Sequence, residues 1–308
     1  MVQGMKETNK KDVIKNIAET YWQLYIDPED PKAQDKYSRI VRMGEDPEKR
    51  TLDHFTGNSL DSDEYRDTPA GKIRVITLYE RSDFVTFLKI MAHRCKPAEI
   101  PPTQGALFLD GVINRRRIDA HREEFLKNSA EAGNQNPDWD SEFRLFTADK
   151  RNYTDTLIVL SYGPYSKVEA SRLGFDDSSW LSYSHTIRSF HECTHFICRR
   201  LYPDKTDPVW DELVADAVGI YAAFGYYDPE MEALFLGITK TGYTFGRLEN
   251  YVDREDYASG EEYRDRLDEL ARESYKTLLQ IKSVFETHIL NDPFDIIPIL
   301  EESKADQT

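Results

Sequence analysis

Cysteine is scarce in this sequence. The 308 residues include three cysteines, Cys95, Cys193 and Cys198. An odd and sparse set of cysteines is not the pattern of a secreted domain held together by disulfides. Four residues separate Cys193 from Cys198, which is not a usual zinc-binding spacing, and there is no second pair. We expect reduced thiols, with Cys193 and Cys198 acting as small buried apolar side chains.

Long apolar runs are also missing. No stretch of the sequence approaches the roughly 20 consecutive apolar residues that a membrane-spanning helix needs. The N-terminal segment MVQGMKETNKKDVIKN is polar and does not contain the apolar core of a secretory signal. We therefore expect a cytoplasmic protein that does not have the membrane as a partner.

An excess of basic residues is absent as well. Lysine and arginine total 40 and aspartate and glutamate total 56, which gives a net charge of -16. The negative electrostatic potential of such a chain repels phosphate backbones and anionic lipids, so we expect no nucleic-acid partner. The acidic surface is most simply explained by solubility, and the sequence does not indicate an oligomeric state.

The chain is long enough for one large domain or two modest ones. Three regions that differ in composition and residue pattern follow one another along it. Residues 1–71 predict an amphipathic helix at 8–26 followed by an extended acidic loop. Residues 72–183 predict an α/β lobe. Its expected strands lie at 72–80, 105–109, 141–149 and 155–164, and its expected helices lie at 82–95 and 114–133.

Residues 184–308 predict a lobe that is almost entirely helical. Ser184 is a suitable N-cap for the first helix of this lobe. Asp207-Pro208 and Asp228-Pro229 each place a capping aspartate before a proline, which favours a helix start at both points. A long charged helix is expected near 259–288. These patterns together predict the α+β fold class.

The first helix of this lobe contains the sequence His191-Glu192-Cys193-Thr194-His195. Residues four apart lie on nearly the same face of a helix, about 6 Å apart along its axis. Two such imidazoles can bind one ion with bonds of about 2.1 Å. Glu192 projects to the side, where it can reach a water on the metal and act as a general base. The alternative is an ordinary histidine pair, but the apolar neighbours predict burial, which is costly without an ion.

A third ligand is expected on the next helix, because catalytic zinc usually has three protein ligands and one water. An antiparallel helix hairpin would place Glu212 opposite the two histidines. Asp216 lies one turn further on the same face and can accept the spare N–H of a ligating histidine. Asp211 is the nearest rival, but it points about 100° away from Glu212. A solvated acidic face is the other interpretation, and the apolar surroundings disfavour it.

These residues resemble the gluzincin branch of the zincin metallopeptidases, the thermolysin-like arrangement. Its signature is H-E-x-x-H on one helix and E-x-x-x-D on the next, matched here by His191, Glu192, His195, Glu212 and Asp216. The resemblance covers about 35 residues and does not identify a subfamily. It implies one Zn²⁺ ion, with Glu212 as third ligand and Asp216 as the residue that orients a histidine.

The resemblance also implies an architecture. A zincin-like fold has an N-terminal lobe with a small twisted mixed sheet and helices, a C-terminal helical lobe, and a metal cleft between them. An edge strand above the cleft would hold a peptide by strand addition. The segments EFRLFTAD, at 142–149, and TLIVLSY, at 156–162, are the two candidates for that strand.

The sequence departs from the better-known gluzincins downstream of Asp216. The exopeptidase markers N-A-x-x-Y and G-x-M-E-N are absent, and no histidine or tyrosine stands out as the group that stabilises the oxyanion. Tyr243, Arg247 and Tyr251 lie in a suitable segment as possible oxyanion or substrate contacts. A packing or surface role is favoured over a catalytic one for each, because the 18 tyrosines of the chain offer many false choices.

The leading hypothesis is a zinc metallopeptidase that acts on a peptide or protein substrate. Its zinc-bound water would attack the scissile bond while Glu192 accepts the proton. The pattern does not distinguish cleavage at chain ends from internal cleavage. The alternative is a catalytically inactive or latent zincin-fold protein that serves as a binding or regulatory module. A helix hairpin without metal is the third possibility.

Overall fold

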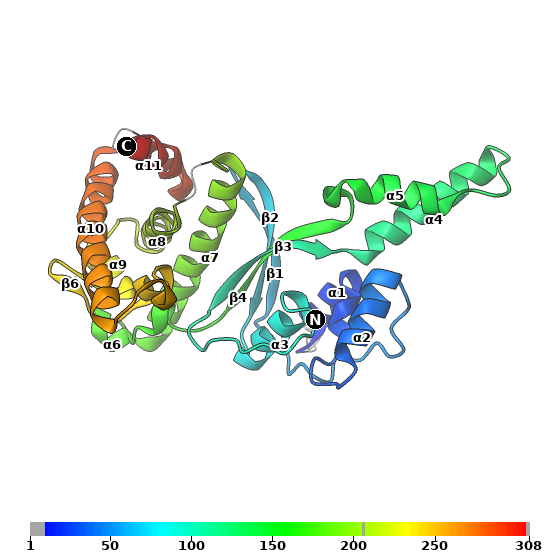
Figure 1. Cartoon of the computed structure of the whole chain (residues 1–308), viewed down its shortest axis with the longest axis horizontal. Coiled ribbons are helices and arrows are strands. Elements are labelled where there is room, and N and C mark those ends of the chain that lie inside the picture. The colour runs from blue at the N-terminus through cyan, green and yellow to red at the C-terminus, as the bar shows by residue number, and fades with distance from the viewer. Residues whose placement is uncertain (1–9, 205–206, 306–308) are drawn as a thin grey trace, which may run out of the picture. The chain divides into compact units, whose positions relative to one another are not determined.

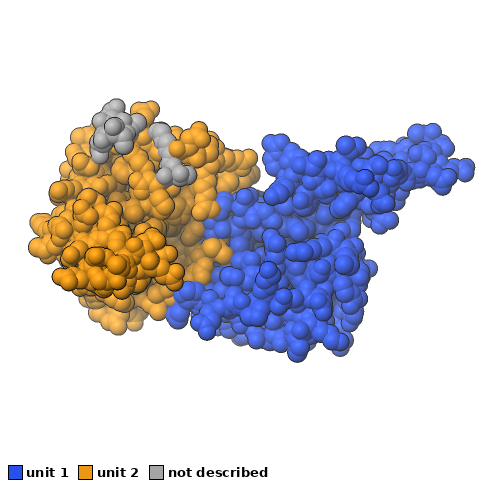
Figure 2. Space-filling model, viewed as in Figure 1, with its two compact units in different colours: residues 1–65, 74–102, 108–161 blue, residues 66–73, 103–107, 162–308 orange. Residues whose placement is uncertain are grey.

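The computed structural model describes residues 10–204 and 207–305. The chain divides into two compact units, shown in Figure 2. Unit 1 comprises residues 1–65, 74–102 and 108–161, and unit 2 comprises residues 66–73, 103–107 and 162–308. The described part is α+β, as the sequence predicts, and it contains a small mixed sheet and a helical C-terminal part (Figure 1).

Most residues of a four-stranded sheet, with the strand order β1-β2-β4-β3, belong to unit 1, whereas residues 66–68, 71–73 and 106–107 of its strands belong to unit 2. The strands are β1 (Ser62–Thr68), β2 (Gly71–Leu78), β3 (Ala106–Ile113) and β4 (Thr154–Ser161). The two central strands β2 and β4 are parallel, with Arg74 opposite Leu157 and Leu78 opposite Ser161. Consecutive residues at the ends of both strands, Val75–Leu78 and Leu157–Ser161, are buried, so both faces of these segments are covered.

The helices of unit 1 are α1 (Asp12–Thr20), α2 (Ala33–Tyr37), α3 (Arg81–Met91), α4 (Arg115–Glu131) and α5 (Trp139–Ala148). Helix α3 packs against β4 through buried aromatic and aliphatic side chains, among them Phe84 and Phe87. Helices α4 and α5 pair as a hairpin (Figure 1). None of the residues of α5 is buried.

Several predictions for the first half of the chain are wrong. Segment 141–149 is not a strand but most of α5, because Asp138 caps a helix by accepting the Ser141 amide, 3.0 Å away. Segment 155–164 does form a strand, but β4 is central, so neither candidate can be an exposed edge; the edges are β1 and β3. The expected loop at 27–71 contains α2, a π-helical turn and β1.

The predicted helix at 8–26 is confirmed only in part. Its α-helical portion is α1, and a 3₁₀ turn (Trp22–Tyr25) follows. Residues 8 and 9 lie outside the described residues. The strand expected at 105–109 is longer and extends to Ile113.

Unit 2 is built on a central helix surrounded by others. Its helices are α6 (Ala170–Leu173), α7 (Asp177–Leu201), α8 (Pro208–Phe224), α9 (Pro229–Leu236), α10 (Gly260–Thr287) and α11 (Ile296–Ala305), and its two short strands are β5 (Ile238–Thr239) and β6 (Gly242–Tyr243). Helix α8 contacts α7, α9, α10 and α11 (Figure 1). This explains why its apolar residues are distributed all around the cylinder.

The ends of α8 follow the expected chemistry. The Asp207 carboxylate accepts the amides of Val209 and Trp210 at 3.1 and 3.2 Å, and Pro208 occupies the first helical position. Gly225 ends the helix with a left-handed φ of 75°. These signals fix the register of α8, and therefore the direction in which its acidic residues point.

Helix α7 begins earlier than predicted. Its N-cap is Asp176, which accepts the Ser179 amide at 2.9 Å, and α7 therefore extends two turns upstream of the expected start. Ser184 is not a cap but a fully buried residue inside the helix. The extra turns give α7 contacts with the segment that precedes it.

Helices α7 and α8 pack side by side with one very close approach. A Cβ atom at Gly219 would lie 2.7 Å from the backbone oxygen of Ile187 and 3.0 Å from its Cγ2. Only glycine permits this separation, because the nearest obstacle is backbone. Gly219 lies three residues after Asp216, and Ile187 lies four residues before His191.

We predict that Gly219→Ala destabilises the chain by about 1–3 kcal/mol, because α7 and α8 must move apart. Helix propensity alone would favour alanine by about 1 kcal/mol, so a net loss identifies the clash. Urea unfolding measures the change. Ala223→Ser, which also adds one atom to α8 but at a half-buried position, is the control; equal stability of the two variants would contradict the prediction.

Candidate metal centre

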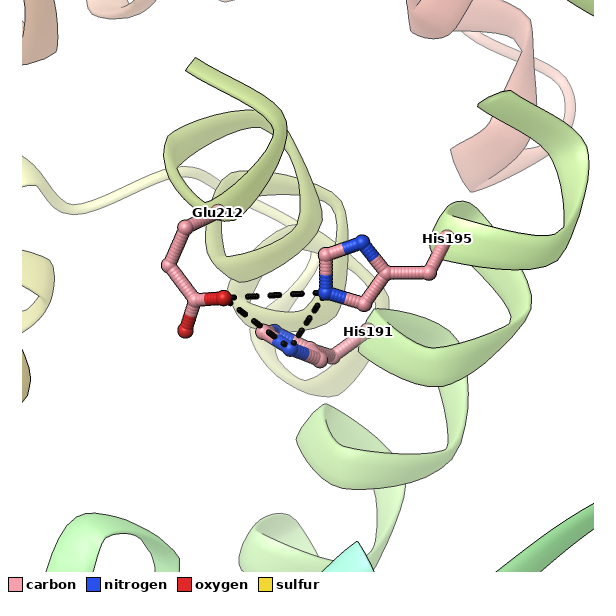
Figure 3. A group of neighbouring side chains, drawn as sticks. All are labelled: His191, His195 and Glu212. Carbon is pink, nitrogen blue, oxygen red and sulfur yellow. Dashed lines mark hydrogen bonds and ion pairs between the residues drawn. The ribbon is translucent and has the colours of Figure 1, made fainter. Parts of the chain in front are cut away.

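Helix α7 contributes two imidazoles that point to the same place (Figure 3). The Nε2 atoms of His191 and His195 lie 3.0 Å apart. His191 is buried and His195 is half-buried. The i, i+4 spacing on one helix face produces this convergence.

Helix α8 places a carboxylate opposite the two imidazoles (Figure 3). Oε2 of Glu212 lies 3.7 Å from Nε2 of His191 and 3.6 Å from Nε2 of His195. A tetrahedral zinc site with bonds of about 2.1 Å separates its ligand atoms by about 3.4 Å. Given the distances here, a point about 2 Å from all three atoms exists. The group can hold a metal ion.

Asp216 sets the orientation of the first imidazole. Its side chain is fully buried, and Oδ1 accepts a hydrogen bond from Nδ1 of His191 at 2.8 Å. With the ring proton on Nδ1, the lone pair of Nε2 faces the Glu212 carboxylate and His195. This is the tautomer that a ligating histidine needs.

Arg247 lies directly on the two acidic residues. It begins the 3₁₀ helix η5 (Arg247–Tyr251), and its Nη1 donates to Oε1 of Glu212 at 2.6 Å while Nη2 donates to Oδ2 of Asp216. The guanidinium therefore occupies one oxygen of each carboxylate. The other oxygen of Glu212 remains directed at the imidazoles, which fits a carboxylate that binds a metal through one atom.

Tyr165 is a site residue that the sequence did not reveal. Its hydroxyl donates to Oδ1 of Asp216 at 2.5 Å and lies 3.0 Å from Nδ1 of His191. The ring also lies 4.9 Å below the guanidinium carbon of Arg247. No motif marks this tyrosine, because it lies outside both helices that carry the histidines and the acids.

The two tyrosines near Arg247 have different places. Tyr251 lies beside Glu212, and burial together with this carboxylate raises the pKa of Tyr251. The Tyr243 hydroxyl instead makes two hydrogen bonds with Gly246. It donates to the Gly246 carbonyl at 2.9 Å and accepts a hydrogen bond from the Gly246 amide at 3.0 Å. Tyr243 thus braces the loop that carries Arg247.

Glu192 lies beside the histidines on α7 and is half-buried. Within residues 10–204 and 207–305, its carboxylate has no hydrogen-bond or ion-pair partner, although its charge acts on His191. Asp211 is not part of the three-residue group, and neither is His185, whose ring packs beside Tyr162. All three cysteines are buried and free, as expected.

Opposing charges govern the protonation of the ligands. Burial acts to lower the pKa of His191, but the carboxylates of Glu212 and Asp216 outweigh it and raise this pKa. Burial acts to raise the pKa of Glu212, but His191 and Arg247 outweigh it and hold this pKa well below the ordinary value. The carboxylate of Glu212, the third ligand of the group, is therefore ready to bind a cation.

A further buried carboxylate lies behind these residues on α9. Glu232 is fully buried; its Oε2 accepts the Tyr227 hydroxyl at 2.8 Å, and its Oε1 has no partner in the described part of the chain. Burial, reinforced by the charge of Asp216, raises the pKa of Glu232 well above the ordinary value.

Comparison with protein-family models gives a match over residues 5–300, to a family of unknown function designated DUF7005. The chain belongs to this family. No curated protein and no solved structure matches the DUF7005 chain. Among its described helices, none has the length and apolar character needed to cross a bilayer.

We predict that Arg247→Met destabilises the metal-free DUF7005 chain by about 3–5 kcal/mol, because two buried carboxylates lose their counter-ion. A bound dication replaces part of the lost charge, so added zinc should raise the melting temperature more in the variant than in the parent. Thermal unfolding with chelator or with zinc measures both. Arg247→Lys, which keeps the charge, should lie between them; a smaller zinc effect in Arg247→Met would contradict the assignment.

We predict that Glu232→Gln becomes more stable relative to the parent as pH rises. A raised native pKa means that the contribution of Glu232 to stability is complete below about pH 4, near its unfolded pKa, and is lost as pH rises through the native pKa. Glutamine keeps the neutral form at every pH. Urea unfolding with chelator at pH 5 and pH 8 measures the difference. Glu261→Gln, at an exposed position on α10, is the control and should show little change.

Proposed function

We propose that this chain is a zinc metallopeptidase of the thermolysin-like gluzincin type, with a peptide or protein as substrate. The observation that carries the proposal is the convergence of three ligand atoms, from His191, His195 and Glu212, on one point. The carboxylate of Glu192, free of hydrogen bonds and ion pairs in the described structure, lies on the same helix beside them.

The donor set supports zinc over harder cations. Two imidazoles and one carboxylate oxygen form the ligand set of thermolysin-like catalytic zinc, whereas Ca²⁺ and Mg²⁺ prefer oxygen ligands throughout. Three protein ligands leave one position for solvent, the feature that separates catalytic from structural zinc sites. We therefore propose one Zn²⁺ ion per chain, held by His191, His195 and Glu212.

A bound Zn²⁺ would polarise the scissile carbonyl and make a neighbouring water acidic at neutral pH. In the proposed reaction, Glu192 accepts the proton of the attacking water and delivers it to the leaving amine. Asp216 holds His191 in its ligating tautomer. Arg247 keeps Glu212 turned toward the imidazoles, and the Tyr251 hydroxyl beside Glu212 is the proposed donor to the developing oxyanion. Tyr243 is engaged with Gly246 and has a bracing role.

A latent or regulatory zincin-fold protein is the second candidate. The observation that favours it is the enclosure of the ligands, since the side chains of His191, His195 and Glu212 retain 7%, 19% and 8% of their exposure. Arg247 donates a hydrogen bond to Glu212, and Tyr251 lies close enough for this carboxylate to raise its pKa. Under this proposal zinc binds normally, but peptides do not reach Glu192.

We predict that Glu192→Gln retains zinc and loses peptide hydrolysis by a factor of about 10²–10⁴, the contribution of a general base. The assay is digestion of a peptide library by zinc-loaded protein, read by mass spectrometry, with metal content measured on the same sample. Glu286→Gln, on the exposed surface of α10, is the matched control and should keep full activity.

The outcomes separate the candidates. Hydrolysis by the parent and the control, but not by Glu192→Gln, supports the metallopeptidase. Stoichiometric zinc without cleavage of any peptide by the parent supports the latent or regulatory protein. Full activity of a zinc-containing Glu192→Gln variant removes Glu192 from the role of base.

A further inference from the structure

We propose that Tyr165 is a positioning residue that fixes the orientation of His191 as a metal ligand. The conformation of segment 163–168 places the Tyr165 hydroxyl where it can do so. The inference rests on the metal site of the proposed function but not on hydrolysis. It concerns a residue outside the H-E-x-x-H and E-x-x-x-D pattern.

The first argument is the balance of hydrogen bonds on Asp216. Arg247 holds Oδ2, whereas Tyr165 and His191 both donate to Oδ1, at 2.5 and 2.8 Å. A guanidinium can bind both oxygens of one carboxylate in parallel. The Tyr165 hydroxyl opposes that rotation, because it anchors Oδ1 at the histidine. Without this hydroxyl, Asp216 is free to turn toward Arg247 and release Nδ1 of His191.

The second argument is the way α7 holds the segment. The indole Nε1 of Trp180 donates to the Val168 carbonyl at 2.7 Å, and the Ser184 hydroxyl accepts the Tyr165 amide at 2.9 Å. The Arg188 guanidinium donates to the carbonyls of Gly163 and Pro164 at 3.2 and 3.3 Å.

The three α7 residues that hold this segment lie on the same helix face as the two histidine ligands. Trp180, Ser184 and Arg188 are spaced four residues apart, and His191 and His195 continue the same face of α7. One helix face therefore holds both the backbone around Tyr165 and the imidazole that Tyr165 orients. The relative position of the hydroxyl and Nδ1 is fixed by a single rigid element.

The third argument is the backbone conformation after Tyr165. Ser166 and Lys167 have left-handed φ values of 49° and 57°. This conformation is strained for any residue other than glycine. The reversal lets Tyr165 and Val168 both point into unit 2 while Lys167 stays exposed. Strain of this kind persists only where surrounding contacts impose it, as the three α7 anchors do here.

The test compares Tyr165→Phe with Tyr227→Phe in the full chain. Both tyrosines are buried, at 4% and 6% exposure, and both donate a hydroxyl to a buried carboxylate, but Tyr227 serves Glu232. Zinc affinity is measured by competition with a chromophoric chelator. We expect Tyr165→Phe to bind zinc about 10–100-fold more weakly, the usual effect of losing a partner that orients a ligand. Tyr227→Phe should bind within about twofold of the parent, although both variants lose thermal stability.

Nitrogen NMR of the metal-free chain supplies a second readout. At alkaline pH, where the imidazole is neutral, the parent should show His191 with its proton on Nδ1, and Tyr165→Phe should show a mixture of tautomers. Ser184→Ala, which removes the anchor of the Tyr165 amide, should weaken zinc binding by a smaller factor and serves if Tyr165→Phe does not fold. Equal zinc affinities of Tyr165→Phe and Tyr227→Phe, with an unchanged tautomer, would overturn the inference.

The readouts also separate this inference from the proposed function. If the parent binds zinc but cleaves no peptide, the metallopeptidase assignment fails while the affinity comparison remains decisive for Tyr165. If the parent binds no zinc, the tautomer of His191 still tests the hydroxyl directly.

Discussion

The carboxylate of Asp216 is the interaction on which the centre depends. It is fully buried on α8, and it receives donors from three other segments: Tyr165 before α7, His191 on α7 and Arg247 after β6. A buried carboxylate is tolerated only when hydrogen bonds and charge compensate it, so these segments must assemble together. Once they do, the orientation of His191 and the position of Glu212 follow.

The packing of α7 on α8 supplies the precision that this arrangement needs. The Asp207-Pro208 start fixes the register of α8, and the missing side chain at Gly219 lets α7 approach its backbone. A change of a few tenths of an ångström here alters the separation of Glu212 from the imidazoles. The constraint on the helices is therefore steric, whereas the constraint on Asp216 is electrostatic.

The sequence predicts what helical periodicity controls. The spacing of His191 and His195, the start of α8 and the direction of Glu212 follow from local rules, and the structure brings these three side chains together. Contacts between distant segments escaped prediction. Tyr165 reaches His191 through a chain reversal with no sequence signature, and β4 is central because of a strand order that no local pattern encodes. The sequence of segment 141–149 predicts a strand because its short apolar pattern fits the two-residue period of a strand as well as the 3.6-residue period of a helix. The N-cap at Asp138 favours the helix α5.

The residues of the centre, from Tyr165 to Tyr251, all belong to unit 2 and lie within one continuous stretch of the chain. Asp216 and its three donors lie 25, 31 and 51 positions apart in the sequence, and the entropy lost in closing such loops grows only slowly with their length. An ion bound at this centre would stabilise only the closed form of the unit, and its occupancy would therefore be linked to local opening of the unit. The four-stranded sheet supplies none of these side chains, and its two central strands contribute buried apolar residues instead.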